Sequence, residues 1–295
     1  MASRPVDKPL VVIVGPTASG KTSLAIDIAN RYDGEIICAD SRTIYKGMDI
    51  GTAKPSQSEQ QIVPHWGLDL VEPGQYYSAA DFKQYANKKI DEIRSRGRIP
   101  ILVGGTGLYI DAVIFDYQFG PPIDENFRAF LDEMSLDELH VYCDAHKITL
   151  PENKNNKRYV IRAIERNNTL PGRRSTPLEN TIVVGITTDK VLLQNRIADR
   201  AEQIFDDGVV KEAIKLGNNY GWNNAAMTSN VYPIIHQYIN KLISLEDAKL
   251  RSRTLDWQLA KRQLTWLKRN KFVQWFSLDE ASEYLCSQLA IFGQP

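Results

Sequence analysis

The sequence predicts an α/β fold with a parallel sheet core, helices on both faces of the sheet, and a small all-helical insertion domain. Short apolar runs alternate with helical stretches over the first third of the chain, as parallel strands joined by helices do. A glycine-rich loop joins the first apolar run to the first helical stretch. From about residue 119 the sequence is more polar, and its pattern predicts helices only. The chain has 295 residues, 43% of them hydrophobic, so it can bury a large core.

The loop after the first apolar run has the spacing G-x-x-x-x-G-K-[ST]. It follows Leu10–Val14, a predicted strand, and precedes a helical pattern over residues 23–32. This order directs backbone N–H groups and a helix N-terminus at one point, which stabilises an anionic phosphate. Lys21 would add a positive charge there, and the Thr22 hydroxyl is placed to bind Mg²⁺. The core is therefore P-loop NTPase-like, with predicted phosphate-binding residues Gly15, Pro16, Thr17, Ala18, Ser19, Gly20, Lys21 and Thr22.

The next elements place polar residues beside this loop. We expect strands over residues 35–39 and 99–103, and a helix over 78–96 that begins at the N-cap Ser78 and ends at Gly97. In open α/β sheets the loops after the strands build the ligand site. Asp40 and the glycine-rich stretch at 104–107 should therefore lie near the phosphate loop.

The middle of the chain is predicted to be an insertion between two parts of the core. A Gly-Pro-Pro hinge at 120–122 is followed by predicted helices over 125–134, 135–146 and 158–166 and by a turn-rich stretch at 167–177. A strand resumes at Thr181–Ile186, and the remainder is expected to be mostly helical. We therefore assign residues 1–118 and 178–295 to the core and 119–177 to the insertion domain.

Composition limits the classes of partner and compartment. Lys plus Arg equals Asp plus Glu at 36 each, so a nucleic-acid partner would have to be met by a local basic patch. Cys38, Cys143 and Cys286 are scattered without metal-ligand spacing, which favours a reducing compartment. No apolar run approaches membrane length. We expect a cytoplasmic, enzyme-like protein that does not enter membranes.

Asp40 leaves three roles open on position alone: a Mg²⁺ ligand, a general base, or a cap of the next helix. The strand at 99–103 runs into glycines without the acid that phosphate-loop NTPases place after a hydrophobic strand. This weakens a kinase or ATPase interpretation.

Three other groups also allow two interpretations. The basic stretch at 259–269 fits either a solvated helix face or a contact surface for a nucleic-acid backbone. Arg196 and Arg200 face one direction on a helix, where they could pair with nearby acids or bind a phosphate. His65 is expected to be a hydrogen-bonded loop histidine.

Six further blocks accompany the phosphate loop. They are residues 40–45, 49–55, 63–65, 77–82, 97–110 and 260–266, which read DSRTIY, DIGTAKP, VPH, YSAADF, GRIPILVGGTGLYI and AKRQLTW. In this order and spacing the chain resembles the tRNA dimethylallyltransferases. The resemblance covers nearly the whole chain, densely over 10–115 and thinly over the insertion.

The resemblance implies transfer of a dimethylallyl group from its diphosphate to N6 of the adenosine just 3′ of the tRNA anticodon. Asp40 resembles the general base of that family, Thr106 a residue that assists it, and Arg200 an arginine that holds the diphosphate beside Lys21. Mg²⁺ on Thr22 is the implied cofactor. We expect the working protein to be a monomer.

The implied partner is the tRNA anticodon stem-loop, and the insertion would close over it like a clamp. The implied tRNA contacts are Asp40, Ser41, Arg42, Thr43, Arg158, Arg162, Lys261, Arg262, Gln263, Trp266 and Lys268. The chain departs from the common family pattern at Thr43, at 230–233, at 256–257 and in the short insertion, mostly on the RNA side. Three alternatives stay open: a free-adenylate isopentenyltransferase, a P-loop small-molecule kinase, and a non-catalytic RNA-binding protein.

Overall fold

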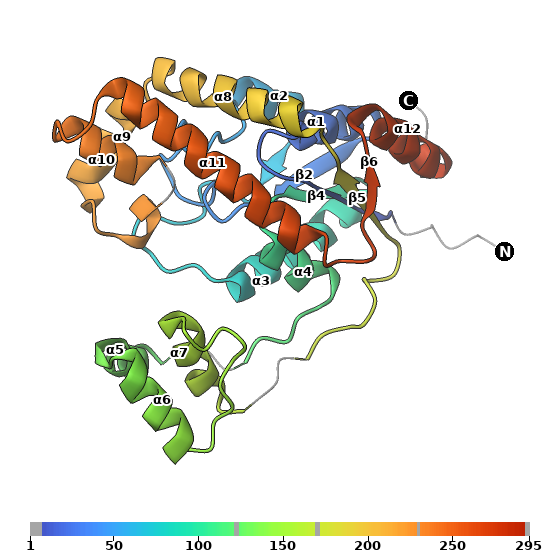
Figure 1. Ribbon diagram of the computed structural model, residues 1–295. Coiled ribbons are helices and arrows are strands. Elements are labelled where there is room, and N and C mark those ends of the chain that lie inside the picture. The colour runs from blue at the N-terminus through green and yellow to red at the C-terminus, as the bar shows by residue number, and fades with distance from the viewer. Residues whose placement is uncertain (1–7, 121–123, 169–171, 229–230, 293–295) are drawn as a thin grey trace. The chain divides into compact units, whose positions relative to one another are not determined.

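A six-stranded parallel sheet forms the core of the larger of two compact units (Figure 1). The computed structural model describes residues 8–120, 124–168, 172–228 and 231–292. The strand order is β3-β2-β4-β1-β5-β6, and each neighbouring pair is parallel. The strands are β1 (Leu10–Val14), β2 (Gly34–Cys38), β3 (His65–Trp66), β4 (Ile99–Gly104), β5 (Thr181–Ile186) and β6 (Gln274–Phe276). The predicted α/β class with a parallel sheet is confirmed.

Strand β1 lies inside the sheet, between β4 and β5, and both of these neighbours come from distant parts of the chain. Ile13 is in register with Val103 of β4 on one side and with Val184 of β5 on the other. All five residues of β1 are buried, as expected for a strand covered on both faces. The phosphate loop therefore leaves the sheet from its central strand.

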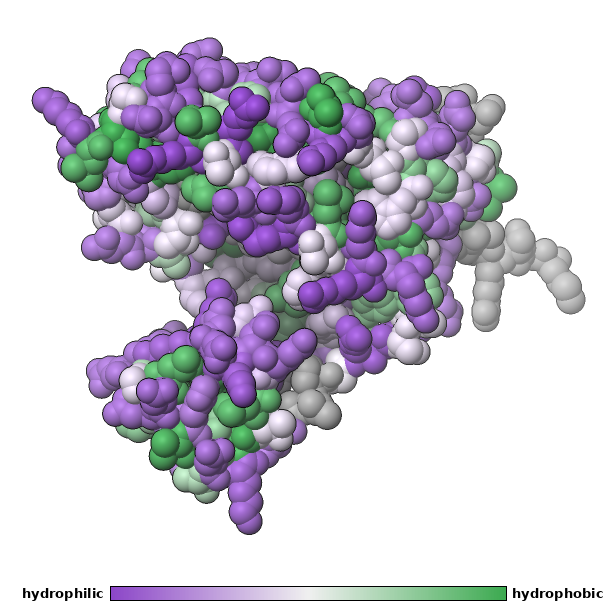
Figure 2. Space-filling model, in the orientation of Figure 1, coloured by the Kyte–Doolittle hydropathy of each residue, from purple (hydrophilic) through white to green (hydrophobic). Residues whose placement is uncertain are grey.

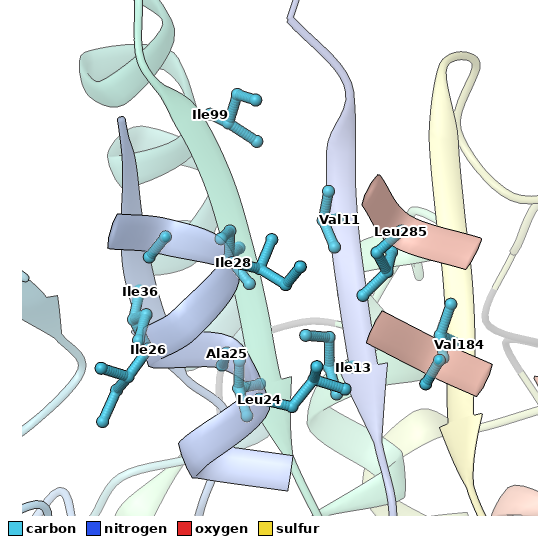
Figure 3. Packing of buried hydrophobic residues seen from close by; sticks show 14 of the residues in the cluster. Val11, Ile13, Leu24, Ala25, Ile26, Ile28, Ile36, Ile99, Val184 and Leu285 are labelled. Atoms are coloured by element: carbon cyan, nitrogen blue, oxygen red, sulfur yellow. The ribbon is translucent and has the colours of Figure 1, made fainter. Parts of the chain in front are cut away.

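Helices cover both faces of the sheet. One face is covered by α1 and α12, whose apolar side chains, among them Leu24, Ile28 and Leu285, pack on Val11 and Ile13 (Figure 3). Helices α3 and α4 pack on each other and lie on the other side of the sheet (Figure 1). Helices of the larger unit are α1 (Lys21–Arg31), α2 (Gln57–Ile62), α3 (Ala79–Ser95), α4 (Gly107–Ile114), α8 (Lys190–Asp206), α9 (Val209–Tyr220), α10 (Tyr232–Ile239), α11 (Leu245–Leu267) and α12 (Leu278–Leu289), with short 3₁₀ turns η1 (Ala225–Thr228) and η2 (Ala290–Phe292).

Helix α3 shows why its predicted limits are correct. The Ser78 hydroxyl accepts a hydrogen bond from the Asp81 N–H at 3.2 Å, and the Asp81 carboxylate accepts one from the Ser78 N–H at 2.8 Å. This reciprocal capping satisfies donors that the first turn cannot pair. Gly97 follows the helix with φ of +74°, a conformation that favours glycine.

The smaller unit spans Asp116–Ser175, close to the 119–177 expected from the sequence. It contains α5 (Glu125–Glu133), α6 (Leu136–Ala145) and α7 (Lys157–Arg166). They enclose their own core, which includes Leu131, Leu139 and Ile161. Apolar residues also reach the surface of this unit in Figure 2. The predicted hinge prolines lie outside the described residues.

Two short edge strands differ from the sequence-based expectation. His65 lies in β3, not in a loop, although its Nδ1 is hydrogen-bonded as expected, 2.9 Å from the Val63 carbonyl oxygen. Strand β6 interrupts a region expected to be mostly helical. Both segments are too short to show a two-residue alternation in the sequence. In the described part of the chain, no helix is both long and apolar enough to cross a membrane.

Candidate active site

A pocket of about 1450 Å³ lies beside the phosphate loop in the larger unit. It is lined by residues 17–25 of the loop and α1, by 40–43 after β2, and by Thr106 after β4. Helices α8 and α11 complete it with Arg196, Arg200, Arg262 and Gln263. The chain thus brings together the ends of three neighbouring strands and two later helices, as expected for ligand sites of open α/β sheets.

The phosphate loop has the backbone shape that its glycines predict. Gly20 has φ of +87° and Ala18 has φ of +60°, so the chain turns sharply before α1 begins at Lys21. A left-handed conformation is costly for alanine. The Ser19 hydroxyl is buried without a hydrogen-bond partner. Strain and an unpaired polar atom in the same loop are typical of a ligand site.

Lys21 is the cation of this loop. Its Nζ donates to the Pro16 carbonyl oxygen at 3.0 Å. Burial lowers the pKa of Lys21 from its usual 10.5 to about 8; the neighbouring Asp40 charge raises the pKa and the Arg200 charge lowers it further. A bound diphosphate would supply the negative charge that this crowded ammonium lacks.

Two arginines of α8 contact the phosphate loop. Arg200 Nη1 donates to the Thr17 hydroxyl, and Arg196 Nη1 donates to the Ser19 carbonyl oxygen at 3.5 Å. Of the acids on the same helix, Glu202 is ion-paired with Lys249 at 2.6 Å. Arg200 Nε is buried and has no hydrogen-bond partner. Arg200 also lines the pocket, so its guanidinium is placed to bind an anion there.

Asp40 and Thr106 lie next to each other at the ends of β2 and β4. Thr106 Oγ1 accepts a hydrogen bond from the Ser41 N–H at 3.1 Å, and Asp40 Oδ1 accepts one from the Arg42 N–H at 2.8 Å. Asp40 thus caps its own turn while lining the pocket. The Thr43 hydroxyl, in a residue only 5% exposed, donates to the Asp40 carbonyl oxygen at 3.5 Å.

A close contact of two backbones sets the position of Asp40. At Gly104, a Cβ atom would lie 2.0 Å from the carbonyl oxygen of Ala39, the residue just before Asp40. The Ala39 N–H also donates to the Val103 carbonyl oxygen at 2.6 Å. Only glycine at 104 permits this approach.

Helix α11 binds the phosphate loop directly, which the sequence did not predict. Gln263 Oε1 accepts a hydrogen bond from the Thr17 N–H at 2.8 Å. A Cβ at Gly105 would lie 2.3 Å from Gln263 Nε2, and one at Gly107 would lie 1.9 Å from Trp266 Cδ1. Gln263 and Trp266, both expected to contact tRNA, thus also dock α11 on the turn after β4. The pairing spans 246 positions in sequence, so no local pattern reveals it.

The remaining basic candidates are divided between the two units. Lys261, Arg262 and Trp266 line a shallow second pocket of about 570 Å³ on α11, and Lys268 is exposed at its end. The face that carries α8 and α11 is largely hydrophilic in Figure 2. The smaller unit carries the other two arginines: Arg158 is exposed, and Arg162 pairs with Glu165 at 3.0 Å.

The side chains present suit a cation that also takes ligands from a substrate. Thr22 lies in the pocket wall beside Lys21. Within the described ranges no group of three or more His, Cys, Asp or Glu side chains could hold a metal ion. Mg²⁺ commonly binds through few protein ligands together with phosphate oxygens and water. Thr22 fits such a site.

Comparison with known proteins gives consistent matches. A sequence model described as IPP transferase matches residues 43–270. The tRNA dimethylallyltransferase of Bacillus pumilus is 38% identical over 97% of this chain and 95% of its own length, and that of Acetivibrio thermocellus is 39% identical over 92% of each.

Solved structures match as well. The tRNA isopentenylpyrophosphate transferase of Bacillus halodurans has a TM-score of 0.74 at 35% identity and covers 97% of both chains. A eukaryotic dimethylallyltransferase acting on tRNA has a TM-score of 0.79 at 23% identity over 98% of this chain and 80% of its own, which shows a shared fold. From the family model and these relatives, the chain belongs to the IPP transferase family.

Proposed function

We propose that this enzyme transfers the dimethylallyl group of dimethylallyl diphosphate to N6 of adenosine 37 in tRNA, giving N6-isopentenyladenosine and diphosphate. The observation that carries the proposal is the convergence, in one pocket, of an anion-binding loop with Asp40 and Thr106. Curated relatives over most of the chain are tRNA dimethylallyltransferases. Transfer of this group needs a site for the leaving diphosphate and a base for the amine, and we assign these roles to the phosphate loop and to Asp40.

In the proposed reaction, each group of the pocket has one step. The bond between the allylic carbon and the diphosphate oxygen breaks, and its electron pair leaves with the diphosphate. The loop N–H groups, Lys21 and Arg200 stabilise that growing charge. The N6 lone pair forms the new carbon–nitrogen bond, and the proton that N6 sheds passes to the Asp40 carboxylate. Thr106 holds the Ser41 backbone beside Asp40.

We propose Mg²⁺ as the cofactor, held by the Thr22 hydroxyl and by substrate oxygens. It would supply positive charge against the diphosphate. Thr22 and Lys21 begin α1, so the helix N-terminus adds to the same effect.

The acceptor site requires the target base to leave the anticodon loop, because the pocket is walled by protein. We propose that the backbone of the anticodon stem-loop binds the basic surface of α11, including Lys261, Arg262 and Lys268, through phosphate contacts. Arg158 and Arg162 of the insertion would contact the stem. We expect a monomer that acts in the cytoplasm on its tRNA.

Mass spectrometry tests the proposal. An unmodified anticodon stem-loop with adenosines after the anticodon is incubated with the protein, dimethylallyl diphosphate and Mg²⁺, beside a second reaction that contains AMP. A five-carbon mass gain on the RNA alone supports the proposal. A gain on AMP alone would identify a free-adenylate isopentenyltransferase, and no gain on either would remove the transferase proposal.

A further inference from the structure

One wall of the pocket is an irregular segment that is held partly by its own residues and partly by side chains from distant parts of the chain. Residues 49–56, here called the wall loop, line the pocket between the turn after β2 and helix α2. The segment has no strand or helix of its own, and Ala53 has φ of +47°. Two of its backbone hydrogen bonds are internal, from the Ala53 N–H to the Ile50 carbonyl oxygen at 3.0 Å and from the Lys54 N–H to the Asp49 carbonyl oxygen at 2.9 Å. The N–H groups of residues 49–51 need partners elsewhere.

A single carboxylate supplies those partners. Glu212 of α9 reaches the wall loop with both oxygens. Glu212 Oε2 accepts from the Asp49 N–H at 2.9 Å and the Ile50 N–H at 2.7 Å. Glu212 Oε1 accepts from the Gly51 N–H at 2.9 Å. Three successive backbone donors converge on it, an arrangement that elsewhere binds anions.

Tyr232 completes this arrangement from α10. Its hydroxyl donates to Glu212 Oε1 at 2.7 Å, and the side chain is 0% exposed. Burial, followed by the nearby Glu212 charge, raises the pKa of Tyr232 well above its usual value, so the hydroxyl stays a neutral donor. A Cβ at Gly51 would lie 2.7 Å from the Tyr232 ring, so the wall loop and Tyr232 fit only with glycine there.

The other end of the wall loop is held by Lys54, whose side chain is only 3% exposed. Its Nζ donates to Asp49 Oδ1 and to Asp69 Oδ1, each at 2.6 Å, and to the Tyr45 carbonyl oxygen at 3.0 Å. Tyr45 is also buried, in the turn that follows Asp40. The wall loop is therefore fixed relative to the turn that carries the proposed general base.

We propose that Glu212 is a positioning residue for the acceptor: it does not line the pocket, but it holds the wall loop in the shape that receives the target base. This rests on the proposed function. The phosphate loop is held by other groups, namely Arg196, Arg200 and Gln263. The role of Glu212 should therefore appear in transfer to the RNA and not in binding of the donor diphosphate.

Glu212→Gln tests this proposal, because the amide keeps the shape of the side chain but turns one acceptor into a donor that faces N–H groups. We expect kcat for transfer to the stem-loop to fall by at least about tenfold, because sub-ångström shifts at a reacting centre are costly. The Kd for dimethylallyl diphosphate should stay within about twofold of the wild-type value. Tyr232→Phe, which removes one donor and leaves the backbone bonds, should lower kcat by about threefold.

The chain offers a matched control on the same helix. Tyr220 of α9 donates its hydroxyl to Glu72 at 2.7 Å, and neither residue lines the pocket. Tyr220→Phe removes the same kind of bond, and Glu72→Gln weakens it together with the ion pair that Glu72 makes with Lys46 at 2.8 Å. Both variants should leave kcat and donor Kd unchanged, whatever they do to the melting temperature.

The outcomes separate this inference from the proposed function. If the wild-type protein modifies the stem-loop and both Glu212→Gln and Tyr232→Phe do so at the wild-type rate, the positioning role is wrong and the function stands. The role is also wrong if kcat in the Glu212 and Glu72 variants falls in proportion to the loss of stability. If the wild-type protein itself transfers nothing, the proposed function fails first.

Discussion

Replacing Gly104 by alanine should move Asp40 and reduce transfer. The new Cβ would lie 2.0 Å from the Ala39 carbonyl oxygen, a backbone atom that cannot rotate away. The gap must widen by about 1.4 Å to reach the 3.4 Å of an ordinary contact. Because Asp40 follows Ala39 directly, part of that displacement reaches its carboxylate.

Two magnitudes follow from that displacement. Misplacement of a reacting group by about 1 Å can cost about 100-fold in rate, so we expect kcat to fall by about that factor. Overpacking at a site closed by backbone should cost about 3 kcal/mol of unfolding free energy. Urea unfolding measures the second quantity, and stem-loop transfer at saturating donor, below both melting temperatures, measures the first.

Gly97→Ala provides the control, because nothing lies within 4 Å of a Cβ there while the backbone φ is +74°. It should lose about 1 kcal/mol through backbone strain and keep the wild-type kcat. The reasoning is refuted if Gly104→Ala keeps the wild-type kcat, or if both variants lose activity in proportion to their loss of stability.

Three further predictions concern the pocket. Asp40→Asn keeps an acceptor for the Arg42 N–H but cannot take the N6 proton, so transfer should fall by at least about 100-fold with diphosphate affinity retained; a wild-type rate would contradict the general-base role. The pKa of Lys21 is lowered to about 8, so its proton is lost as pH rises through 8 and kcat/KM for the donor should fall above that pH, whereas Lys21→Arg should stay flat to higher pH. A wild-type profile that is flat to pH 10 would show that Lys21 stays charged. Gln263→Ala removes the acceptor for the Thr17 N–H and should raise KM for the donor by roughly fivefold, about 1 kcal/mol; an unchanged KM would show that Gln263 does not order the loop.

The sequence predicted those elements whose signals are local. Leu10–Val14 and Thr181–Ile186 were identified as strands with the bounds that the structure has, because both are apolar runs with turn residues beside them. The Ser78 cap was predicted from another local signal, a serine that directly precedes a helical pattern. Strand β6 was missed because three residues, Gln274–Phe276, are stabilised by pairing with β5 and not by their own pattern.

The site was predicted in part, and the missing part is tertiary. Fixed glycines and a lysine at set spacing identify the phosphate loop, and strand ends predict that Asp40 lies near it. The partners of Arg196 and Arg200 could not be chosen, because helical spacing allows an acid on the same helix as well as the loop on another. Glu212 gave no signal, because one acid in a helix is ordinary until its three backbone donors are seen.

The position of β1 constrains the order in which the strands of the sheet can pair during synthesis. Its partner β4 ends at Gly104, but its other partner, β5, begins at Thr181, beyond the whole smaller unit. One hydrogen-bonding edge of the central strand therefore stays open while the ribosome makes the insertion. While the ribosome translates the residues between Gly104 and Thr181, the nascent chain exposes an apolar strand edge that other nascent chains can pair with.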